Sequence, residues 1–303
     1  MNYLNLIRWK NLLLIALTQY LIKYALFEPF NVTTTLNDYG FALLVLTCLC
    51  IAAAGYVIND LFDIEADTIN KPNKVLIGKS ISEKAAFNLF IALNIVGVGL
   101  GFYISQVVGK SVLFPIFVAI SAILYVYSSY LKHLPLVGNI IISIVVASTL
   151  LIVGIFELLP VMTVDNRATQ ITFFDIIFDY AIFAFMINLI RELIKDIEDV
   201  DGDHKMGSNT LPIAIGRDRA KKVAFVLSLV PIGVITYYVI TYLYHKIEAV
   251  IYFLVLVVAP LIYVVIKIYT ADSKANYKHI STMLKLVMLT GLLSLLLYQF
   301  ILK

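Results

Sequence analysis

Two short acidic segments, far apart in the sequence, repeat the same spacing of aspartates. The first, residues 59–67, reads NDLFDIEAD, and the second, residues 195–203, reads KDIEDVDGD. On a helix, steps of three and four residues keep side chains on one face, so each segment is predicted to project a stripe of carboxylates. The aspartates that follow these steps are Asp60, Asp63 and Asp67 in the first segment and Asp196, Asp199 and Asp203 in the second.

Two such stripes suit the binding of a diphosphate through Mg²⁺. Mg²⁺ prefers oxygen ligands and usually bridges one or two carboxylates to substrate phosphates. Carboxylates alone would repel an anionic substrate, so facing stripes are explained only with metal ions between them. The ions would act as Lewis acids on the charge of a departing pyrophosphate. A single acidic cluster is more simply a solvated helix end, but two clusters of matched spacing favour the metal site.

The composition places most of the chain in a lipid bilayer. Of 303 residues, 61% are hydrophobic and only 14% are charged, whereas a soluble domain is about half apolar and about a quarter charged. The net charge of +3 is small and the basic residues lie in separate short loops, which argues against a nucleic-acid partner. Cys48 and Cys50 lie in an apolar stretch and indicate neither a disulfide nor a metal site.

Nine segments are apolar over the roughly 20 residues that a spanning helix needs. Arg8 and Lys10 precede the first segment without a small-residue cleavage site, so we expect this helix to be retained. The acidic segments open two long polar loops, at 59–84 and 195–222, and no soluble part is long enough to fold separately. We therefore expect one membrane-embedded domain over residues 1–303. The predicted spans are 11–29, 39–58, 85–106, 111–130, 136–157, 173–194, 222–243, 247–269 and 281–302.

The basic residues predict the orientation of these helices. With the N-terminus in the cytoplasm, all but five of the 23 Lys and Arg residues lie on the cytoplasmic side, as do both acidic loops. Richness in Asn, Ile and Lys points to an AT-rich bacterial genome, and so to a bacterial plasma membrane. The five exceptions are Lys23, Lys110, Arg167, Lys246 and Lys303.

With these motifs, the chain resembles the UbiA superfamily of intramembrane prenyltransferases over nearly its whole length. The first segment matches the family's Asn-Asp-x-x-Asp-x-x-x-Asp pattern, and the second its Asp-x-x-x-Asp pattern at Asp199 and Asp203. The resemblance implies an all-α fold of nine transmembrane helices around a central cavity. Further matching stretches are Tyr127-Ser128 with Lys132, Gly138-Asn139, and Thr210-Leu211-Pro212 followed by Gly216.

The resemblance also implies roles for individual residues. Asp63, Asp199 and Lys132 would be catalytic, with Lys132 contacting the diphosphate of an isoprenyl substrate. Where the family often continues Asn-x-Pro-x-Arg-Pro after the first motif, this chain has Lys74 in place of the arginine and loses its planar fork for phosphate. The implied Mg²⁺ ligands are Asn59, Asp63, Asp199 and Asp203, and the residues next to the metal or diphosphate are Asp60, Asp67 and Asp196.

The acceptor is addressed by a narrower resemblance. Residues 191–203, together with Arg8 and Asn11, look most like the digeranylgeranylglyceryl phosphate synthase branch of the family. That branch implies geranylgeranyl diphosphate as donor and attack by a glycerol hydroxyl on an allylic cation, which forms an ether. Arg8, Lys10, Arg191 and Lys195 are candidates for binding an acceptor phosphate, although each could be a helix-end residue reaching the interface. The expected substrate-binding residues are Arg8, Asn11, Tyr56, Tyr125, Lys132, Asn188 and Lys195.

Two alternatives stay open. An aromatic acceptor of hydroxybenzoate or naphthoate type, as in quinone biosynthesis, would use the same motifs up to formation of the cation. A transporter could also have nine helices and functional carboxylates, but transporters usually carry them near the bilayer midplane, whereas these lie at helix ends. The sequence thus predicts a Mg²⁺-dependent prenyltransferase whose partners are an isoprenyl diphosphate, a lipid or aromatic acceptor, and membrane lipid.

Overall fold

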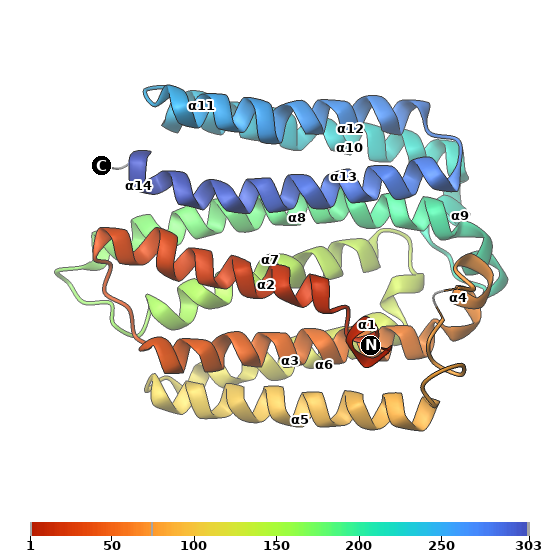
Figure 1. Ribbon diagram of the computed structural model, residues 1–303, viewed down its shortest axis with the longest axis horizontal. Helices are drawn as coiled ribbons and strands as arrows, with labels where there is room; N and C mark the ends of the chain where they lie inside the picture. The colour runs from red at the N-terminus through yellow and green to blue at the C-terminus, as the bar shows by residue number, and fades with distance from the viewer. Residues whose placement is uncertain (1, 74, 302–303) are drawn as a thin grey trace.

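The helices of the computed structural model run side by side along one axis, and their connections gather at its two ends (Figure 1). The structure describes residues 2–73 and 75–301. Within them, nine helices are long and apolar enough to cross a membrane and no strand forms, which confirms the all-α, nine-span prediction. The spans are Trp9–Phe30, Asp38–Phe62, Glu83–Val107, Ser111–Ser129, Val137–Glu157, Arg167–Lys205, Arg217–Leu243, Ile247–Thr270 and Lys274–Phe300.

Several spans join α-helical segments to turns of other helix types. The α-helices are α1 (Asn2–Leu6), α2 (Trp9–Leu21), α3 (Asp38–Phe62), α4 (Ile64–Asn70), α5 (Glu83–Val107), α6 (Phe114–Ser129), α7 (Val137–Glu157), α8 (Arg167–Lys205), α9 (Leu211–Ile215), α10 (Arg217–Tyr238), α11 (Ile247–Phe253), α12 (Ala259–Thr270), α13 (Lys274–Leu293) and α14 (Tyr298–Ile301). The π-helical turns are Ile22–Phe27, Val239–Leu243 and Leu254–Val258, and the 3₁₀ turns are Glu28–Phe30, Ser111–Leu113, Leu131–His133 and Ser294–Leu297.

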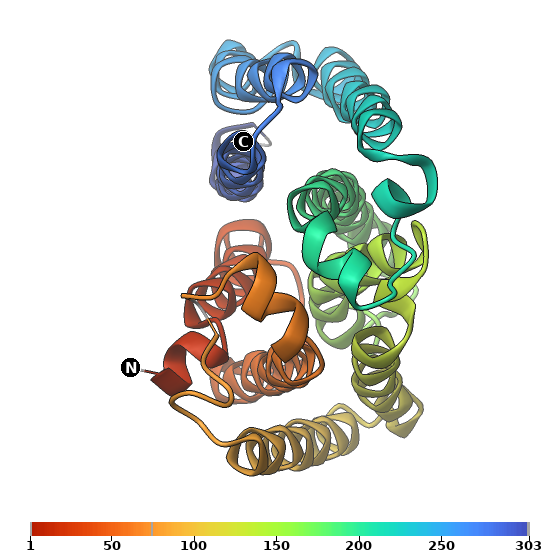
Figure 2. The same cartoon turned by 90° about the vertical axis from the view of Figure 1, so that its right-hand side faces the viewer.

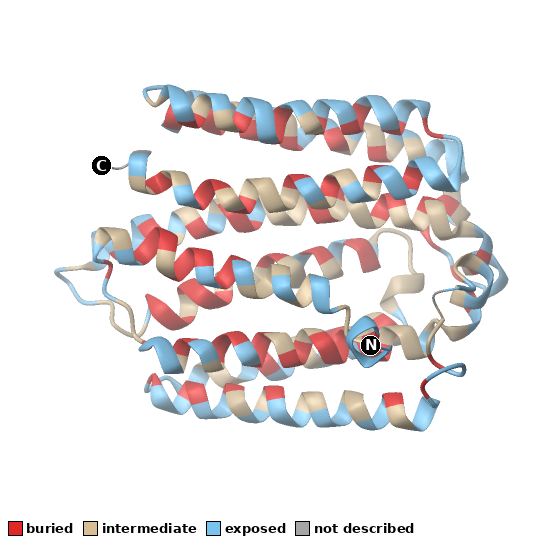
Figure 3. Ribbon diagram, in the orientation of Figure 1, coloured by how far each residue is buried: buried red, intermediate tan, exposed pale blue. Residues whose placement is uncertain are grey.

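Seen from the end that carries α4 and α9, the spans follow one another around a ring in chain order (Figure 2). The ring closes where α13 returns to contact α2 and α8. The outer faces of peripheral helices such as α5 are exposed (Figure 3). These faces are apolar, with Ile95, Phe102 and Tyr103 each more than half exposed. Apolar surface of this kind is stable only against lipid, so the chain is an integral membrane protein.

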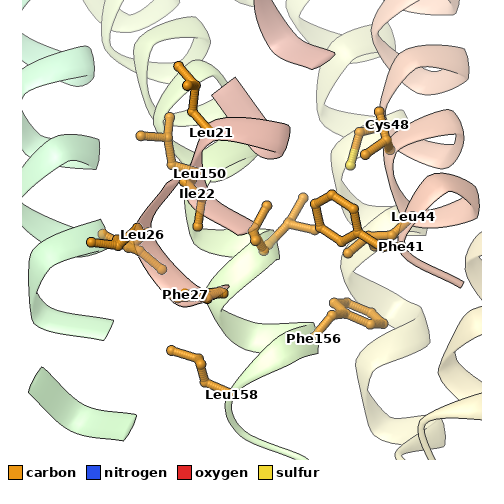
Figure 4. Packing of buried hydrophobic residues seen from close by; sticks show 14 of the residues in the cluster. Leu21, Ile22, Leu26, Phe27, Phe41, Leu44, Cys48, Leu150, Phe156 and Leu158 are labelled. Atoms are coloured by element: carbon orange, nitrogen blue, oxygen red, sulfur yellow. The ribbon is translucent and has the colours of Figure 1, made fainter. Parts of the chain in front are cut away.

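The largest apolar cluster joins the first span to α3, α6, α7 and α8. Phe27, Phe41 and Phe156 are completely buried in it (Figure 4). Cys48 lies in the same cluster, and both cysteines are free thiols.

Lys23 is buried, although the sequence placed it among the basic residues of the non-cytoplasmic side. Its Nζ donates to Glu157 Oε1 at 2.9 Å and to the Leu36 carbonyl at 2.6 Å. Glu157 Oε2 accepts from the Leu36 amide at 2.9 Å, and only 4% and 0% of the Lys23 and Glu157 side chains are exposed. The ion pair ties α7 to the first span, and the hydrogen bonds to Leu36 tie both to the connection between the first two spans, at the end away from the acidic segments.

The second acidic segment is helical, and the prediction of a loop from residue 195 was wrong. α8 continues to Lys205, far beyond the apolar part of the span. The change from apolar to charged residues marks where the helix leaves the bilayer, not where it ends, because its backbone hydrogen bonds remain within the helix.

Candidate active site

Both acidic segments line one cavity, at the end of the bundle that carries α4 and α9. We call it the acidic cavity, and its volume is about 540 Å³. The segments come from α3–α4 and from α8, which are separated by three spans in the sequence and meet only in the folded chain. The predicted residues that line it are Arg8, Asn59, Asp60, Asp63, Asp67, Lys132, Lys195, Asp196, Asp199 and Asp203.

The first carboxylate stripe is interrupted by a bend in the backbone. α3 ends at Phe62 and α4 begins at Ile64, while Asp63 between them adopts φ −96° and ψ 5°. The Asp63 amide still donates to the Asn59 carbonyl at 3.0 Å. The bend turns α4 across the end of the bundle toward α8, so the predicted straight stripe is correct for α8 only.

Asp63 is held by two donors from different elements. Lys132 Nζ, from the 3₁₀ turn after α6, donates to Asp63 Oδ1 at 2.6 Å. Asn59 Nδ2 donates to Asp63 Oδ2 at 2.7 Å, which leaves the Asn59 amide oxygen as the acceptor for another group. The side chain of Lys132 is 10% exposed. The structure therefore brings together the three residues that the sequence proposed for metal and diphosphate at this position.

The turn that carries Lys132 packs tightly against the start of α7. A Cβ atom at Gly138 would lie 2.7 Å from Lys132 Cα and 2.9 Å from the Leu131 carbonyl. Glycine is therefore required here for the close approach of two backbones. The next residue, Asn139, donates from Nδ2 to Asp196 Oδ2 at 2.8 Å, which links the same helix start to the second motif.

Arg8 joins the first span to the acidic segment of α3. Its backbone is left-handed, with φ 52°, and separates α1 from α2. The guanidinium donates to Asp60 Oδ1 at 2.6 Å and lies 5.0 Å from the centre of the Tyr56 ring. Left-handed backbone is uncommon and costly for a residue other than glycine and is found most often at functional sites.

A second cavity, which is largely apolar, lies directly below the acidic one inside the ring. This central apolar cavity runs from Asn59 past Gly55 to Cys48 and Ile152. It shares part of its lining with the acidic cavity, so the two meet. The shared residues are Arg8, Asn59, Tyr127, Glu192 and Lys195.

Of the seven predicted substrate-binding residues, five line the central apolar cavity, one lines the acidic cavity alone, and one lines neither; Arg8 and Lys195 are two of the five. Asn11, Tyr56 and Asn188 are the other three, and Lys132 lies in the acidic cavity above. Tyr125 lines neither cavity. This residue is 44% exposed, and its aromatic ring contacts Phe62 and Phe90 on the outer side of the helix bundle. Residues two apart point to opposite sides of a helix, so Tyr127 takes the inward position.

The sequence-based interpretation missed several residues of the site. Lys71 forms an ion pair with Asp199, and Tyr127 lines both cavities. Glu192 accepts from Arg191 at 2.9 Å and from Lys195 at 2.8 Å. Glu192 could have been found, because it precedes Asp196 by four residues and so extends the same helical stripe. Lys74 lies outside the described residues.

The acidic cavity has an excess of negative charge. Its described lining includes seven carboxylates but only four Lys or Arg side chains. Burial, and then repulsion from Asp63, raises the pKa of Asp67 to about 6. Carboxylates that gather without enough cations are stabilised by added positive charge.

The donor set of this cavity fits Mg²⁺. Carboxylate and amide oxygens are its preferred ligands, and it commonly takes only one or two carboxylates, with water and substrate phosphates completing the shell. Among the described residues, no group of three or more His, Cys, Asp or Glu is gathered closely enough to hold a metal by itself, so water or phosphate oxygens would have to complete the shell. The site is thus suited to a metal that arrives with, or is completed by, a phosphate ligand.

Comparison with known proteins agrees with this geometry. The UbiA prenyltransferase family model matches residues 30–289. The chain belongs to the UbiA prenyltransferase family. A digeranylgeranylglyceryl phosphate synthase from Methanosphaera stadtmanae is 32% identical over 266 residues, which cover 85% of this chain and 88% of that protein. Another, from Methanopyrus kandleri, is 33% identical over 192 residues, but the match spans only 64% of its length.

Solved structures of UbiA proteins share the fold. A structure of digeranylgeranylglyceryl phosphate synthase has a TM-score of 0.63 and 26% identity, covering 97% of this chain and 98% of the other. A UbiA homologue from Archaeoglobus fulgidus, bound to GPP and Mg²⁺, has a TM-score of 0.58 and 18% identity, covering 98% and 99%. Similarity at 18% identity shows a shared fold and no more.

Proposed function

We propose that this UbiA protein transfers a geranylgeranyl group from its diphosphate to a hydroxyl of a glycerol phosphate lipid, in a Mg²⁺-dependent reaction that forms an ether. The observation that carries the proposal is the junction of the two cavities at Asn59, where a polar chamber rich in carboxylates meets an apolar chamber. A prenyl diphosphate has the same division, with a charged head and a hydrocarbon tail. The head fits the acidic cavity and the tail fits the central apolar cavity.

The four predicted ligands, Asn59, Asp63, Asp199 and Asp203, are the residues that we propose hold Mg²⁺. The metal would supply positive charge that stabilises the departing pyrophosphate. Asp60, Asp67 and Asp196 lie in the same cavity and add to its negative charge. Lys132 and Lys71, which pair with Asp63 and Asp199, are placed to donate to diphosphate oxygens that enter the cavity.

The bond changes balance without any further reactant. The allylic C–O bond to the diphosphate breaks, and its electron pair leaves with pyrophosphate. The hydroxyl oxygen of the acceptor forms the new C–O bond and loses its proton to pyrophosphate or water. Tyr56 and Tyr127 present aromatic rings to the central apolar cavity, where ring faces can stabilise an allylic cation.

The acceptor class follows the named relatives and the cations of the site. Relatives from Methanosphaera stadtmanae and Methanopyrus kandleri are named digeranylgeranylglyceryl phosphate synthases. Arg8, Arg191 and Lys195 line the central apolar cavity and would suit a phosphate-bearing acceptor. An aromatic acid remains the competing acceptor, since the donor half of the site would serve it equally.

We also propose one domain whose N-terminus and acidic cavity face the cytoplasm. The two acidic segments, α4 and α9 lie at the same end of the bundle (Figure 1). This supports the orientation that the basic residues predict. The relatives reported above are archaeal, so the bacterial source stays a prediction from composition.

The test is a transfer assay with the purified full chain in detergent or lipid nanodiscs. We expect radiolabelled geranylgeranyl diphosphate to give an ether-linked lipid with geranylgeranylglyceryl phosphate, only in the presence of Mg²⁺. Product with a hydroxybenzoate or naphthoate instead would replace the lipid acceptor by an aromatic one. No release of pyrophosphate with either acceptor would overturn the assignment as a prenyltransferase of this class.

A further inference from the structure

A cluster of basic side chains lies where α2, α8 and α13 meet, and it shares Lys195 and Glu192 with the lining of the acidic cavity. Lys285 of α13 donates from Nζ to Asn11 Oδ1 of α2, and this bond joins the first span to the last. Asn11, which accepts this bond, lines the central apolar cavity together with Arg191 and Lys195 of α8. Sequence patterns gave no sign of Lys285, because it stands alone in an apolar span.

The cluster carries more positive charge than its own carboxylate balances. Arg191 and Lys195 both donate to Glu192, which is the carboxylate they share, whereas the partner of Lys285 among the described residues is a neutral amide. Arg191 Nε is buried and has no hydrogen-bond partner within residues 2–73 and 75–301. The three cations and one carboxylate leave a surplus of two positive charges. A phosphate monoester carries about −1.5 to −2 charges at pH 7 and three acceptor oxygens, which matches this surplus.

An apolar cavity lies deeper in the membrane, directly below the cluster. We call it the lateral apolar cavity. It is formed by α2, α7, α8 and α13 together with α10–α11 and η6 (Leu254–Val258) and has almost no polar lining. Leu14 and Ile15 line it one turn below Asn11, and Met288 lines it one turn below Lys285. A lipid whose phosphate binds the cluster would therefore place its chain in this cavity.

The lateral and central apolar cavities lie next to each other. Ile15, Val146 and Thr149 line both, so these side chains form the partition between them. Arg191 and Lys195 also line the central cavity. A headgroup held by the cluster would thus have its neighbouring hydroxyls next to the chamber that we assign to the donor.

We propose that Lys285, with Arg191 and Lys195, binds the phosphate of the lipid acceptor and that the acceptor's hydrocarbon chain lies in the lateral apolar cavity between α2 and α13. This inference rests on the proposed function and names the subsite of the acceptor. It assigns the two hydrocarbon chains to separate cavities, the donor's in the central one and the acceptor's in the lateral one. Lys285 is then a specificity-determining residue for an anionic headgroup.

The headgroup is tested with Lys285→Met, which keeps the length of the side chain and removes its charge. We expect the KM for geranylgeranylglyceryl phosphate to rise about tenfold or more, since a hydrogen bond to a charged group is lost. The KM for geranylgeranyl diphosphate should not change. With geranylgeranylglycerol, which lacks the phosphate, the variant and the wild type should be equally poor. Lys267→Met, on α12 away from the cluster, is the control and should match the wild type.

The position of the acceptor's chain is tested with Gly291→Leu. Gly291 lines the lateral apolar cavity, and a Cβ there meets nothing within 4 Å, so the larger side chain fills the cavity without a clash at its root. We expect the KM for the lipid acceptor to rise at least about fivefold, with the KM for the donor unchanged. Gly233→Leu is the matched control, because its Cβ also meets nothing within 4 Å but Gly233 is exposed on α10.

Binding without turnover separates this inference from the proposed function. The Kd of geranylgeranylglyceryl phosphate for wild type and variants is measured by native mass spectrometry in the absence of donor. Weaker binding by Lys285→Met and Gly291→Leu, and not by the controls, supports the acceptor subsite even if the wild type transfers nothing. Unchanged Kd and KM in both variants overturn the subsite, and they leave the proposed reaction standing wherever the wild type is active.

Discussion

The side-chain amide of Asn70 docks onto the last turns of α8 beside Gly202. Asn70 Oδ1 accepts from the Gly202 amide at 3.0 Å, and its Nδ2 donates to the Asp199 carbonyl at 2.7 Å. A Cβ at Gly202 would lie 2.3 Å from the Asn70 side chain and 2.8 Å from the Ala66 carbonyl. Glycine at this position therefore allows α4 to contact α8, and this contact holds the two acidic motifs at one cavity.

Substitution of either partner is expected to separate the motifs. In Gly202→Ala, the added methyl must displace α4, and in Asn70→Leu both hydrogen bonds are lost. Since a misplacement of about 1 Å can cost about a hundredfold in rate, we expect kcat to fall by about tenfold to a hundredfold in both. Pyrophosphate release and thermal unfolding would be measured together. Near-normal kcat in Gly202→Ala would contradict the role given to this contact.

The proposed metal ligands make a second prediction. Asp63→Asn and Asp199→Asn each remove one negative charge and keep the size of the side chain, so the spans should fold as in the wild type. Each carboxylate is proposed to hold Mg²⁺, whose positive charge stabilises the departing pyrophosphate. Its loss is therefore expected to lower kcat by at least about a thousandfold. Mg²⁺ titrations of pyrophosphate release, with circular dichroism for the fold, would check this. Either variant working at near wild-type rates would remove that residue from the ligand set.

Lys132 and Lys71 are expected to contribute unequally to donor binding. The Lys132 side chain is 10% exposed and bonds Asp63, whereas that of Lys71 is 26% exposed and bonds Asp199. An ion pair that is screened less by water is the stronger one. We therefore expect Lys132→Met to raise the KM for the prenyl diphosphate by about tenfold or more, and Lys71→Met to raise it less.

The control for these lysines lies in the same loop region. The Lys79 side chain is exposed and donates to the carbonyl of Pro72, its one hydrogen-bond partner in the described part of the chain, so Lys79→Met should leave the KM for the donor unchanged. The order of the three effects is the informative result. An equal effect in Lys71→Met and Lys132→Met would show that burial does not govern their contribution.

The elements of the site could be predicted from the sequence, because they depend on local patterns. Apolar length predicted the nine spans, and the steps of three and four residues predicted that Asp196, Asp199 and Asp203 share a face of α8. The end of α8 was predicted wrongly. The change to polar residues marks where the helix leaves the bilayer, whereas the helix itself continues as long as its backbone hydrogen bonds do. Tyr125 was placed in the site by its distance along the chain, without regard to the side of α6 that it occupies.

The contacts between distant elements could not be predicted in the same way. Asn70 and Gly202, or Lys71 and Asp199, meet because α4 turns back across the end of the bundle, and no periodicity encodes that turn. Lys285 and Asn11 meet because the ring closes between the last span and the first. Such pairs depend on the three-dimensional path of the chain, which an isolated sequence does not reveal.

The buried pair of Lys23 and Glu157 leads to a prediction about stability and not about catalysis. Removal of one partner leaves the other charge buried without compensation, which typically costs about 3–5 kcal/mol in the free energy of unfolding. We expect Lys23→Met to lower the melting temperature clearly while the KM for the donor is unchanged, because the pair lies at the end away from the acidic cavity.

The double variant Lys23→Met with Glu157→Gln should recover part of the loss, since no unpaired charge remains. Lys110→Met, an exposed lysine, is the control. A Lys23→Met protein that melts with the wild type would show that this ion pair does not stabilise the fold.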